Sequence, residues 1–513
     1  MATRLTYTTG ARSPELDRAF EAALTEMRER EPEPLAHLVG GRDVATGDPF
    51  EREDPSQRER IASRAQEGGE VVGDAVEAAR VAQREWRRLP HAERVAFLRA
   101  TERLIDERKL ELAAAVSMEA GKVRTESIAE VEEAIDLIET YCRQVEEAEG
   151  FETPLGQLAP DERNVDVLRP YGVFGVIAPF NFPFALGFGM TAAALAAGNA
   201  VVLKPPEEAP QSGGAVARLL AEAGVPDCVI SLVHGGPATG EALVGSGVDG
   251  IAFTGSAEVG REIGRRMSEG PFPRPVLAEM GGKNAAIVGA SADLDAAAEG
   301  IAKAAFGFSG QKCSACSRAI VVDAAHDELV ERLAEIAATY GVGDPADPDA
   351  ATGPVVNAQA VERFECSVDR ARRDGVVAAG GSRGEASGWF VEPTVVSGLP
   401  LGHPLSRDEL FLPFVTVVRV PDFAGALAEA NAVPYGLTAG VFSRDEGELD
   451  RFLDEIEAGV VYVNRRAGAT TGAWPGIQSF CGWKSSGLTG KGGLGPYYVQ
   501  QFAREQSRTI VGP

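Results

Sequence analysis

Lysine and histidine are scarce in this sequence. Lysine supplies only eight of the 50 basic residues and there are five histidines, whereas Asp and Glu together number 76. The formal net charge of -26 argues against nucleic acids and anionic membranes as partners, because both would repel the chain. An acidic, lysine-poor surface of this kind is suited to hydration in a salt-rich cytosol, so we expect halophilic-like stability that depends on salt.

Cysteine is also scarce, and its spacing is not that of a secreted disulfide framework. The opening residues, MATRLTYTTGARS, lack the apolar core of a signal peptide, which predicts a cytoplasmic location. Two of the six cysteines form a CxxC pair, which could belong to a redox centre or to half of a zinc site. A zinc site needs further ligands, and neither a second CxxC nor a paired histidine is present, so no metal site is expected. The six are Cys142, Cys228, Cys313, Cys316, Cys366 and Cys481.

No charged residue occurs between Val173 and Leu203, a length that could suggest a membrane span. Pro179, Asn181 and Pro183 interrupt this stretch, which divides more naturally into three elements. We predict a strand over 173–179, a small-residue helix over 183–198 and a second strand over 199–205. Such a βαβ unit implies a parallel sheet covered by helices on both faces, and no membrane insertion.

Hydrophobic periodicity predicts two α/β domains that adjoin near residues 280–313. Helices are expected over 15–30 and through much of 73–147, where Ala, Glu, Arg and Leu recur at helical spacing. Strands and helices then alternate after the first βαβ unit. The further strands are predicted over 229–235, 250–255, 274–282, 320–323, 375–381, 393–398 and 414–420.

The segment FGFSGQKCSACSRAIV carries the candidate nucleophile, Cys313. Glycine and serine around it allow close approach of a ligand, and the ammonium of Lys312 would favour the reactive thiolate. Cys316 is expected to be an inert packing residue. A cysteine nucleophile in a hydrolase usually has a histidine base, but no histidine here stands in a recognisable motif. Glu279, at the end of an apolar strand in LAEMGGKN, is the better base, because partial burial would raise its pKa towards neutrality.

A dinucleotide site is indicated by two segments, although no GxGxxG fingerprint follows an early strand. In IAFTGSAEVGREIG an apolar strand leads through Thr254, Gly255 and Ser256 into a helix, whose N-terminus could receive a pyrophosphate while Ser256 donates to a phosphate oxygen. In VVLKPPEE, Lys204 and Glu207 could bind ribose hydroxyls. A carboxylate at the adenosine ribose would repel a 2′-phosphate, which favours NAD over NADP.

Together these segments resemble the aldehyde dehydrogenase superfamily from about residue 35 to the C-terminus. The motifs, in order, are APFNFP, LKPPEEAP, FTGSAEVG, AEMGGKN, GQKCSACSR and DELFLPFVTV. The resemblance implies that Asn181 donates to the oxyanion, that Val259 lies at the cofactor, that Glu409 binds the nicotinamide ribose and that Phe411 lies beside the nicotinamide. With Cys313 and Glu279, these residues would form the catalytic and NAD-binding sites.

Within that superfamily the chain most resembles enzymes that oxidise L-glutamate γ-semialdehyde (1-pyrroline-5-carboxylate). FGFSGQKCSACSR and NRRAGATTGAWPGIQSFCGWKSSG carry this likeness. It implies that the backbone N–H groups of Gly472 and Ala473, with Ser314, hold the α-carboxylate of the substrate. Phe480 would pack on its aliphatic part, and Lys312 would also contact it; Gly-rich turns present such donors without side-chain obstruction.

Several positions depart from the pattern of that superfamily. Phe180 replaces Trp and Met280 replaces Leu, both keeping an apolar side chain. Leu412 replaces Gly, and we expect it to crowd the nicotinamide loop. Ser479 and Cys481 stand where Pro and Gly are usual, which alters the backbone of the loop that anchors the substrate.

The resemblance implies an aldehyde dehydrogenase-like α/β fold. It would comprise a Rossmann-type NAD-binding domain (1–155 and 173–285), an α/β catalytic domain (286–488) and a small β oligomerisation flap (156–172 and 489–513). The C-terminal segment is expected to pair with a neighbouring subunit, so a homo-oligomer, dimer or higher, is predicted.

The implied activity is NAD-dependent oxidation of glutamate γ-semialdehyde to glutamate through a cysteine thioester, in proline or arginine catabolism. An aldehyde dehydrogenase for another semialdehyde, such as succinate semialdehyde, would share everything except the anchor loop. A cysteine hydrolase or thiol acyltransferase is an alternative of another class, and it would leave the dinucleotide segments without purpose. A catalytically silent structural protein is disfavoured, because all the reactive residues are present.

Overall fold

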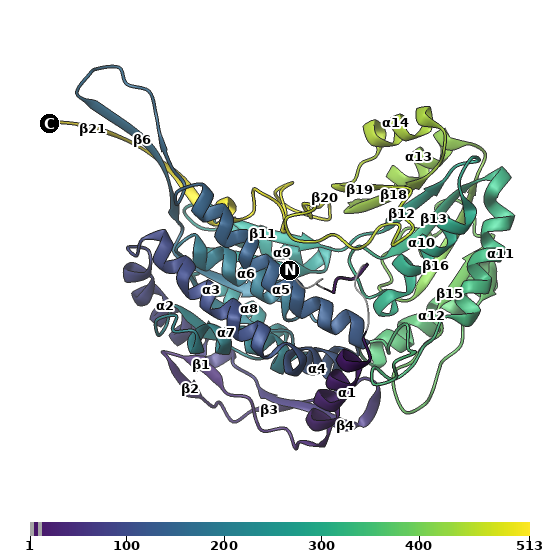
Figure 1. Ribbon diagram of the computed structural model, residues 1–513, viewed down its shortest axis with the longest axis horizontal. Helices are drawn as coiled ribbons and strands as arrows, with labels where there is room; N and C mark the ends of the chain where they lie inside the picture. Colours follow the sequence, from purple (N-terminus) through teal and green to yellow (C-terminus); the bar gives the residue numbers. More distant parts are fainter. Residues whose placement is uncertain (1–4, 9–12, 513) are drawn as a thin grey trace.

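The computed structural model describes residues 5–8 and 13–512. Two α/β halves, each built around a seven-stranded sheet, lie side by side, and a narrow β ribbon projects from the first half (Figure 1). The first sheet ends at Met280 and the second begins at Asn284, so three residues join the two halves. The assignment of these halves to an NAD-binding and a catalytic domain stays a prediction.

The first sheet has five parallel strands and two antiparallel strands at one edge, in the order β11-β10-β7-β8-β9-β1-β2. Strands β8 and β10 lie on opposite sides of β7, so the direction of winding reverses there. Ligands of open α/β sheets bind beyond the carboxyl ends of strands at such a reversal. The strands are β1 His37–Val39, β2 Arg42–Val44, β7 Val173–Ile177, β8 Ala200–Lys204, β9 Ile230–Leu232, β10 Gly250–Gly255 and β11 Val276–Met280.

Helices cover both faces of this sheet. One layer packs α6 and α7 on the strands and α3, α4 and α5 outside them, while α2, α8 and α9 cover the other face. The predicted βαβ unit is confirmed as β7, α6 and β8, and the Ala-rich α6 is buried. In residues 5–8 and 13–512 no helix is both long and apolar enough to cross a membrane. The helices are α1 Pro14–Glu29, α2 Val72–Trp86, α3 His91–Glu107, α4 Lys109–Ala120, α5 Arg124–Glu147, α6 Ala185–Ala196, α7 Pro210–Glu222, α8 Pro237–Gly245 and α9 Ala257–Met267.

The second sheet follows the order β14-β15-β16-β13-β12-β18-β19, with only β14 antiparallel to its neighbour. Its strands are β12 Asn284–Val288, β13 Cys316–Val322, β14 Val376–Ala379, β15 Thr394–Ser397, β16 Phe414–Val420, β18 Thr438–Phe442 and β19 Val460–Val463. Its helices are α10 Leu294–Phe306, α11 Asp323–Thr339, α12 Ala358–Asp374, α13 Phe423–Asn431 and α14 Glu446–Glu455. Hydrophobic periodicity predicted four of these strands but not β12, β18 or β19.

The projecting ribbon is a three-stranded antiparallel sheet of β5 Glu152–Pro154, β6 Glu162–Pro170 and β21 Ala503–Val511. Strand β21 pairs with β6 of its own chain from Ala503 opposite Pro170 to Val511 opposite Glu162. Strand β21 is the outermost strand of this sheet, so its other edge pairs with no strand of residues 5–8 and 13–512. The assignment of this ribbon to an oligomerisation flap stays a prediction. Two two-stranded antiparallel sheets complete the strands: the hairpin of β3 Pro49–Asp54 with β4 Gln57–Gln66, and β17 Tyr435–Gly436 paired with β20 Trp483–Lys484.

Candidate active site

Two cavities meet between the halves of the molecule, and Cys313 lies where they join. The larger, about 1020 Å³, extends over the carboxyl ends of the first sheet, at the reversal of winding beside β7. The smaller, about 70 Å³, lies beneath α5 and α6. Five residues line both cavities: Leu186, Thr254, Glu279, Cys313 and Phe480.

A tight turn positions Cys313. After α10 the backbone of Phe308, Ser309 and Gly310 is left-handed, with φ of 49°, 51° and 67°. Gly310 must be glycine, because a Cβ there would lie 2.0 Å from the carbonyl oxygen of Leu412. The Ser309 hydroxyl donates to Gly353 O, and Asn284 Nδ2 donates to Cys313 O at 2.7 Å. These bonds hold the nucleophile loop against the second sheet.

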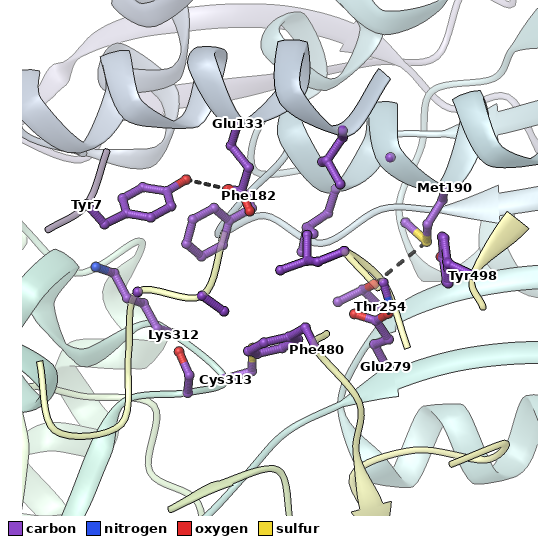
Figure 2. A pocket seen from close by; sticks show the side chains of 18 of the residues that line it. Tyr7, Glu133, Phe182, Met190, Thr254, Glu279, Lys312, Cys313, Phe480 and Tyr498 are labelled. Atoms are coloured by element: carbon purple, nitrogen blue, oxygen red, sulfur yellow. Dashed lines mark hydrogen bonds between the residues drawn. The ribbon is translucent and has the colours of Figure 1, made fainter. Parts of the chain in front are cut away.

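The surroundings of Cys313 favour the thiol over the thiolate. Burial, and then the carboxyls of Glu279 and Glu409, raise the pKa of Cys313, and backbone N–H groups only partly offset this. The prediction that Lys312 stabilises the thiolate is wrong. Its Nζ forms an ion pair with Glu126 at 2.7 Å and points away from the sulfur (Figure 2). Lys312 does line the smaller cavity, as expected of a substrate-binding residue.

Glu279 lies near the end of β11, where strand and cavity meet. Its Oε1 accepts a hydrogen bond from the N–H of Gly493 at 2.6 Å. Burial raises the pKa of Glu279 to about 7, although the bond from Gly493 opposes the shift. A carboxyl that titrates near neutrality is suited to general base catalysis.

Asn181 follows β7 and is buried. One hydrogen of its Nδ2 is donated to Gln311 O at 2.9 Å, which ties the amide to the residue two before Cys313. The amide lines the larger cavity, and its second hydrogen can serve as a donor there. The preceding Phe180 contacts Phe411 edge-on, with ring centroids 5.8 Å apart, so the replacement of Trp keeps an aromatic wall.

The predicted adenosine and pyrophosphate residues line the larger cavity. Helix α9 begins at Ala257, as expected, and the Ser256 side chain accepts a hydrogen bond from Val259 N at 3.3 Å. Lys204, at the end of β8, is buried, and burial lowers its pKa while the Glu207 carboxylate opposes this. Burial, and then the neighbouring Glu208, raise the pKa of Glu207. The full set is Lys204, Glu207, Thr254, Gly255, Ser256 and Val259.

Glu409 and Phe411 line the same cavity nearer Cys313. Glu409 accepts a hydrogen bond from Gly282 N at 2.9 Å, and burial raises its pKa to about 7. Gly281 lets this carboxyl approach the backbone, because a Cβ there would lie 1.9 Å from Glu409 Oε2 and the carboxyl would have to move. The expectation that Leu412 crowds this loop is wrong, since its side chain is buried in an apolar cluster with Phe414 and outside the residues that line the cavity.

These groups fit a dinucleotide. The N-terminus of α9 offers backbone donors and a positive dipole end for a pyrophosphate, while Lys204, Glu207 and Glu409 present polar groups for ribose hydroxyls. The cavity is also long enough to run from α9 to Cys313. Arg363, which the sequence analysis missed, adds a guanidinium to the wall near Glu409 and donates through Nε to Leu410 O at 2.8 Å.

All five predicted substrate residues line the smaller cavity: Lys312, Ser314, Gly472, Ala473 and Phe480. Arg465 holds the Gly472 turn by donating to the carbonyl oxygens of Thr471 at 2.8 Å and Gly472 at 2.9 Å. Neither the Gly472 nor the Ala473 N–H has an acceptor among residues 5–8 and 13–512. These donors are therefore available to a carboxylate.

Further residues of this cavity were not found from sequence. Some of them, such as Phe182 of APFNFP, lie inside a recognised motif, but which side chains face the cavity depends on packing between distant elements. Figure 2 shows Tyr7 and Lys312 on the left and Met190, Tyr498 and Glu279 on the right, with Glu133 above Cys313. The lining residues that were not predicted are Tyr7, Glu133, Leu137, Tyr141, Phe182, Leu186, Gly189, Met190, Gly493, Leu494 and Tyr498.

The unusual residues of the anchor loop lie beside this cavity but do not line it. Cys481 donates its S–H to Gly459 O at 3.4 Å, and Ser479 packs against Gly495. Phe480 alone reaches the cavity, with its backbone N–H bound to Gly493 O at 2.9 Å. The departures therefore leave Phe480 in the predicted position.

Comparisons with known proteins agree with this geometry. A family model described as the aldehyde dehydrogenase family matches residues 43–507. A 1-pyrroline-5-carboxylate dehydrogenase of Geobacillus sp. (strain WCH70) is 35% identical over 500 residues, 96% of each chain. The structure of 1-pyrroline-5-carboxylate dehydrogenase from Thermus with bound NAD is 34% identical, with a TM-score of 0.94 over 100% of this chain and 99% of the other. Proline utilization A from Bdellovibrio bacteriovorus gives 34% identity and a TM-score of 0.93 over 98% of this chain, which spans only 53% of that longer protein.

Proposed function

The chain belongs to the aldehyde dehydrogenase family, and from this premise we propose that it oxidises L-glutamate γ-semialdehyde to L-glutamate with NAD. One observation carries the proposal: Cys313 and Glu279 lie where a dinucleotide-sized cavity meets a small cavity with two backbone donors, Gly472 and Ala473, that have no acceptor among residues 5–8 and 13–512. The 1-pyrroline-5-carboxylate dehydrogenases among its relatives support the same substrate, and with it a role in proline or arginine catabolism.

NAD would be held by the N-terminus of α9, Lys204, Glu207 and Glu409, and when bound it supplies the acceptor for the hydride that leaves the aldehyde carbon. The acidic surroundings of the ribose segment favour NAD over NADP. Coulombic repulsion from Glu207 and its neighbours Glu208 and Glu67 would oppose a 2′-phosphate.

The acylation half depends on Cys313 and Asn181. The sulfur bonds to the aldehyde carbon, and because the resting group is a thiol its proton must pass to a base. Glu279 is the base we assign, because it lines both cavities and titrates near neutrality. The carbonyl oxygen becomes negative as the carbon–sulfur bond forms. We assign its stabilisation to the free Asn181 Nδ2 hydrogen and the Cys313 backbone N–H.

Loss of hydride from the carbon leaves a thioester on Cys313, and hydrolysis then frees the enzyme. Glu279 takes a proton from water, whose oxygen bonds to the thioester carbon, and the carbon–sulfur bond breaks. The aldehyde and one water thus yield a carboxylic acid, one hydride and one proton. Because the thioester stays bonded to Cys313, the oxidation and the hydrolysis occur as separate steps.

Substrate choice rests on the two charged groups of the α-carbon. The free N–H groups of Gly472 and Ala473 would bind the α-carboxylate, and the Glu133 carboxyl would bind the α-ammonium. Succinate semialdehyde has the carboxylate but lacks the ammonium. The presence of Glu133 in the cavity therefore favours glutamate γ-semialdehyde.

The test is NADH formation by purified enzyme with the two semialdehydes, at low and high salt, with Cys313→Ala as the inactive control. We expect a higher kcat/KM for glutamate γ-semialdehyde. A preference for succinate semialdehyde would overturn the substrate assignment. Absence of NADH with any aldehyde would favour a cysteine hydrolase or acyltransferase instead.

We propose further that copies of the chain associate through the ribbon of β5, β6 and β21. An edge strand offers unpaired backbone groups to another chain, and Ile510 and Val511 on β21 are exposed. The test is the mass in solution of the full chain and of its Thr509→Pro variant, measured by light scattering. The same mass for both, equal to one chain, would contradict it.

A further inference from the structure

Tyr7 reaches the substrate cavity from outside the part of the chain that defines the family. The family match covers residues 43–507, whereas Tyr7 lies in the short N-terminal segment before α1. Its ring packs edge-on against Phe182 at 5.7 Å and Trp474 at 5.6 Å between centroids, and Lys312 Nζ lies 5.3 Å from its centroid. Tyr7 thus touches Phe182 next to Asn181, Lys312 next to Cys313, and Trp474 of the anchor loop. Family membership alone does not assign it a role.

The hydroxyl of Tyr7 fixes an acidic group of the cavity. It donates to Glu133 Oε2 at 2.5 Å, and Figure 2 shows the two side chains meeting at the edge of the pocket. Within residues 5–8 and 13–512 no donor reaches the other oxygen, Oε1. Glu133 therefore keeps one acceptor for a ligand while Tyr7 limits its rotation.

The N-terminal segment also packs on the anchor loop. A Cβ placed on Gly472 would lie 2.6 Å from Cγ2 of Thr8, so the segment and the loop are in close contact. Gly472 has a φ of 90°, and glycine is needed there for both reasons. The Tyr7 ring consequently forms part of the wall where the anchor loop meets α5.

The space available makes such a wall selective. The cavity of about 70 Å³ is large enough for about five water molecules, at about 10–15 Å³ for each. A short amino-acid side chain fits this space, and an aldehyde longer than glutamate γ-semialdehyde would meet its wall. Of residues 5–8, only Tyr7 lines the cavity, and its aromatic ring forms part of that wall.

We propose that Tyr7 is a specificity-determining residue: its ring limits the length of the aldehyde, and its hydroxyl presents Glu133 to the α-ammonium of the substrate. The second part rests on the proposed function, whereas the first applies to any aldehyde. Removing the hydroxyl and removing the ring should therefore have separable effects.

The test compares wild type, Tyr7→Phe, Tyr7→Ala and the control Phe272→Ala, an aromatic residue that is 64% exposed and outside both cavities. The substrates are glutamate γ-semialdehyde, succinate semialdehyde, propanal and octanal, which is longer than glutamate γ-semialdehyde. For Tyr7→Phe we expect KM for glutamate γ-semialdehyde to rise about tenfold, as for a lost hydrogen bond to a charged group, with KM for propanal unchanged. For Tyr7→Ala we expect kcat/KM for octanal relative to propanal to rise about tenfold, with kcat for propanal within about twofold of wild type.

The outcomes separate the two parts of the proposal. A ratio of kcat/KM for octanal to kcat/KM for propanal that is the same in Tyr7→Ala and in Phe272→Ala would overturn the length limit. An unchanged ratio of kcat/KM for the two semialdehydes in Tyr7→Phe would overturn the role of the hydroxyl, and this variant keeps the aromatic ring and its edge-on contacts. If wild type fails to oxidise glutamate γ-semialdehyde, the proposed function and the ammonium role fall together, while the octanal and propanal series still decides the length limit.

Discussion

Replacement of Glu279 by glutamine is expected to stop the enzyme after the first half of its reaction. The amide keeps the size and the bond from Gly493 N through its oxygen, but it cannot take a proton from water. General bases typically contribute about 10²- to 10⁴-fold to a rate, so kcat should fall by about that factor. Loss of hydride from the carbon involves no proton transfer to Glu279, and without this carboxylate the proton of the Cys313 thiol can pass to solvent, so NADH should still appear once per active site.

The raised pKa of Glu279 adds a signature in the wild type. The base is the deprotonated form, which predominates above its pKa of about 7. About one-tenth of the sites are in this form at pH 6 and about nine-tenths at pH 8, so steady-state turnover limited by hydrolysis should rise about ninefold across this interval. Burial is the cause, because the ionised carboxylate is desolvated in the cavity wall.

The assay is rapid mixing of enzyme, NAD and aldehyde with NADH absorbance as the readout, from pH 6 to pH 8. Wild type should give steady turnover, and Glu279→Gln a burst of one NADH per site followed by a slow phase. Glu328→Gln on the exposed side of α11 is the matched control and should behave as wild type. If Glu279→Gln turned over at the wild-type rate, or kept the wild-type pH profile without a burst, the assignment of this base would be refuted.

The remaining predictions concern the oxyanion, the thiol, the cofactor and salt. Asn181→Ala should lower kcat by about 10²- to 10³-fold, the range for loss of an oxyanion donor, with a smaller change in KM measured in the same assay. Alkylation of Cys313 by iodoacetamide, followed by mass spectrometry, should be slower at pH 7 than that of free cysteine; each unit of raised pKa lowers the thiolate fraction about tenfold. Glu207→Gln should raise kcat/KM for NADP relative to NAD by about tenfold, because a nearby negative charge is removed from the ribose site. The melting temperature should be higher in molar KCl than in dilute buffer, as expected for a net charge of -26, and equal values would contradict a halophilic character.

The parts of the site that could be predicted from sequence are those built by short local motifs. Cys313, Glu279 and the Thr254–Ser256 turn each lie at the end or start of one regular element, where hydrophobic periodicity stops and Gly or Ser follows. The end of a strand fixes the positions of the few side chains that follow it. The first βαβ unit was predictable for the same reason, and with it the position of Asn181.

Residues whose direction depends on distant elements were mispredicted or missed. Lys312 stands next to Cys313 in sequence, but Glu126 of α5, 186 residues earlier, draws its ammonium away from the sulfur. Leu412 turns into the second half of the molecule rather than towards the cofactor cavity. Tyr7 belongs to a segment with no periodic pattern, so nothing in the sequence links it to Glu133, 126 residues later.

Buried carboxylates of the outer helical layer explain how loops so far apart are brought into register. Glu130 of α5 accepts from the N–H groups of Phe184 and Ala185, where α6 begins just after Asn181, and pairs with the buried Lys122 at 2.5 Å. Glu119 of α4 accepts from Gln211 N at 2.9 Å and Ser212 N at 2.8 Å, where α7 begins after the Lys204 segment. A helix N-terminus leaves N–H groups unsatisfied, and a buried carboxylate meets both that need and the favourable end of the helix dipole. Burying these charges is costly unless every partner is in place, so their bonds specify one arrangement of α6 and α7 on α4 and α5. The oxyanion donor and the ribose-binding segment inherit their positions from that arrangement.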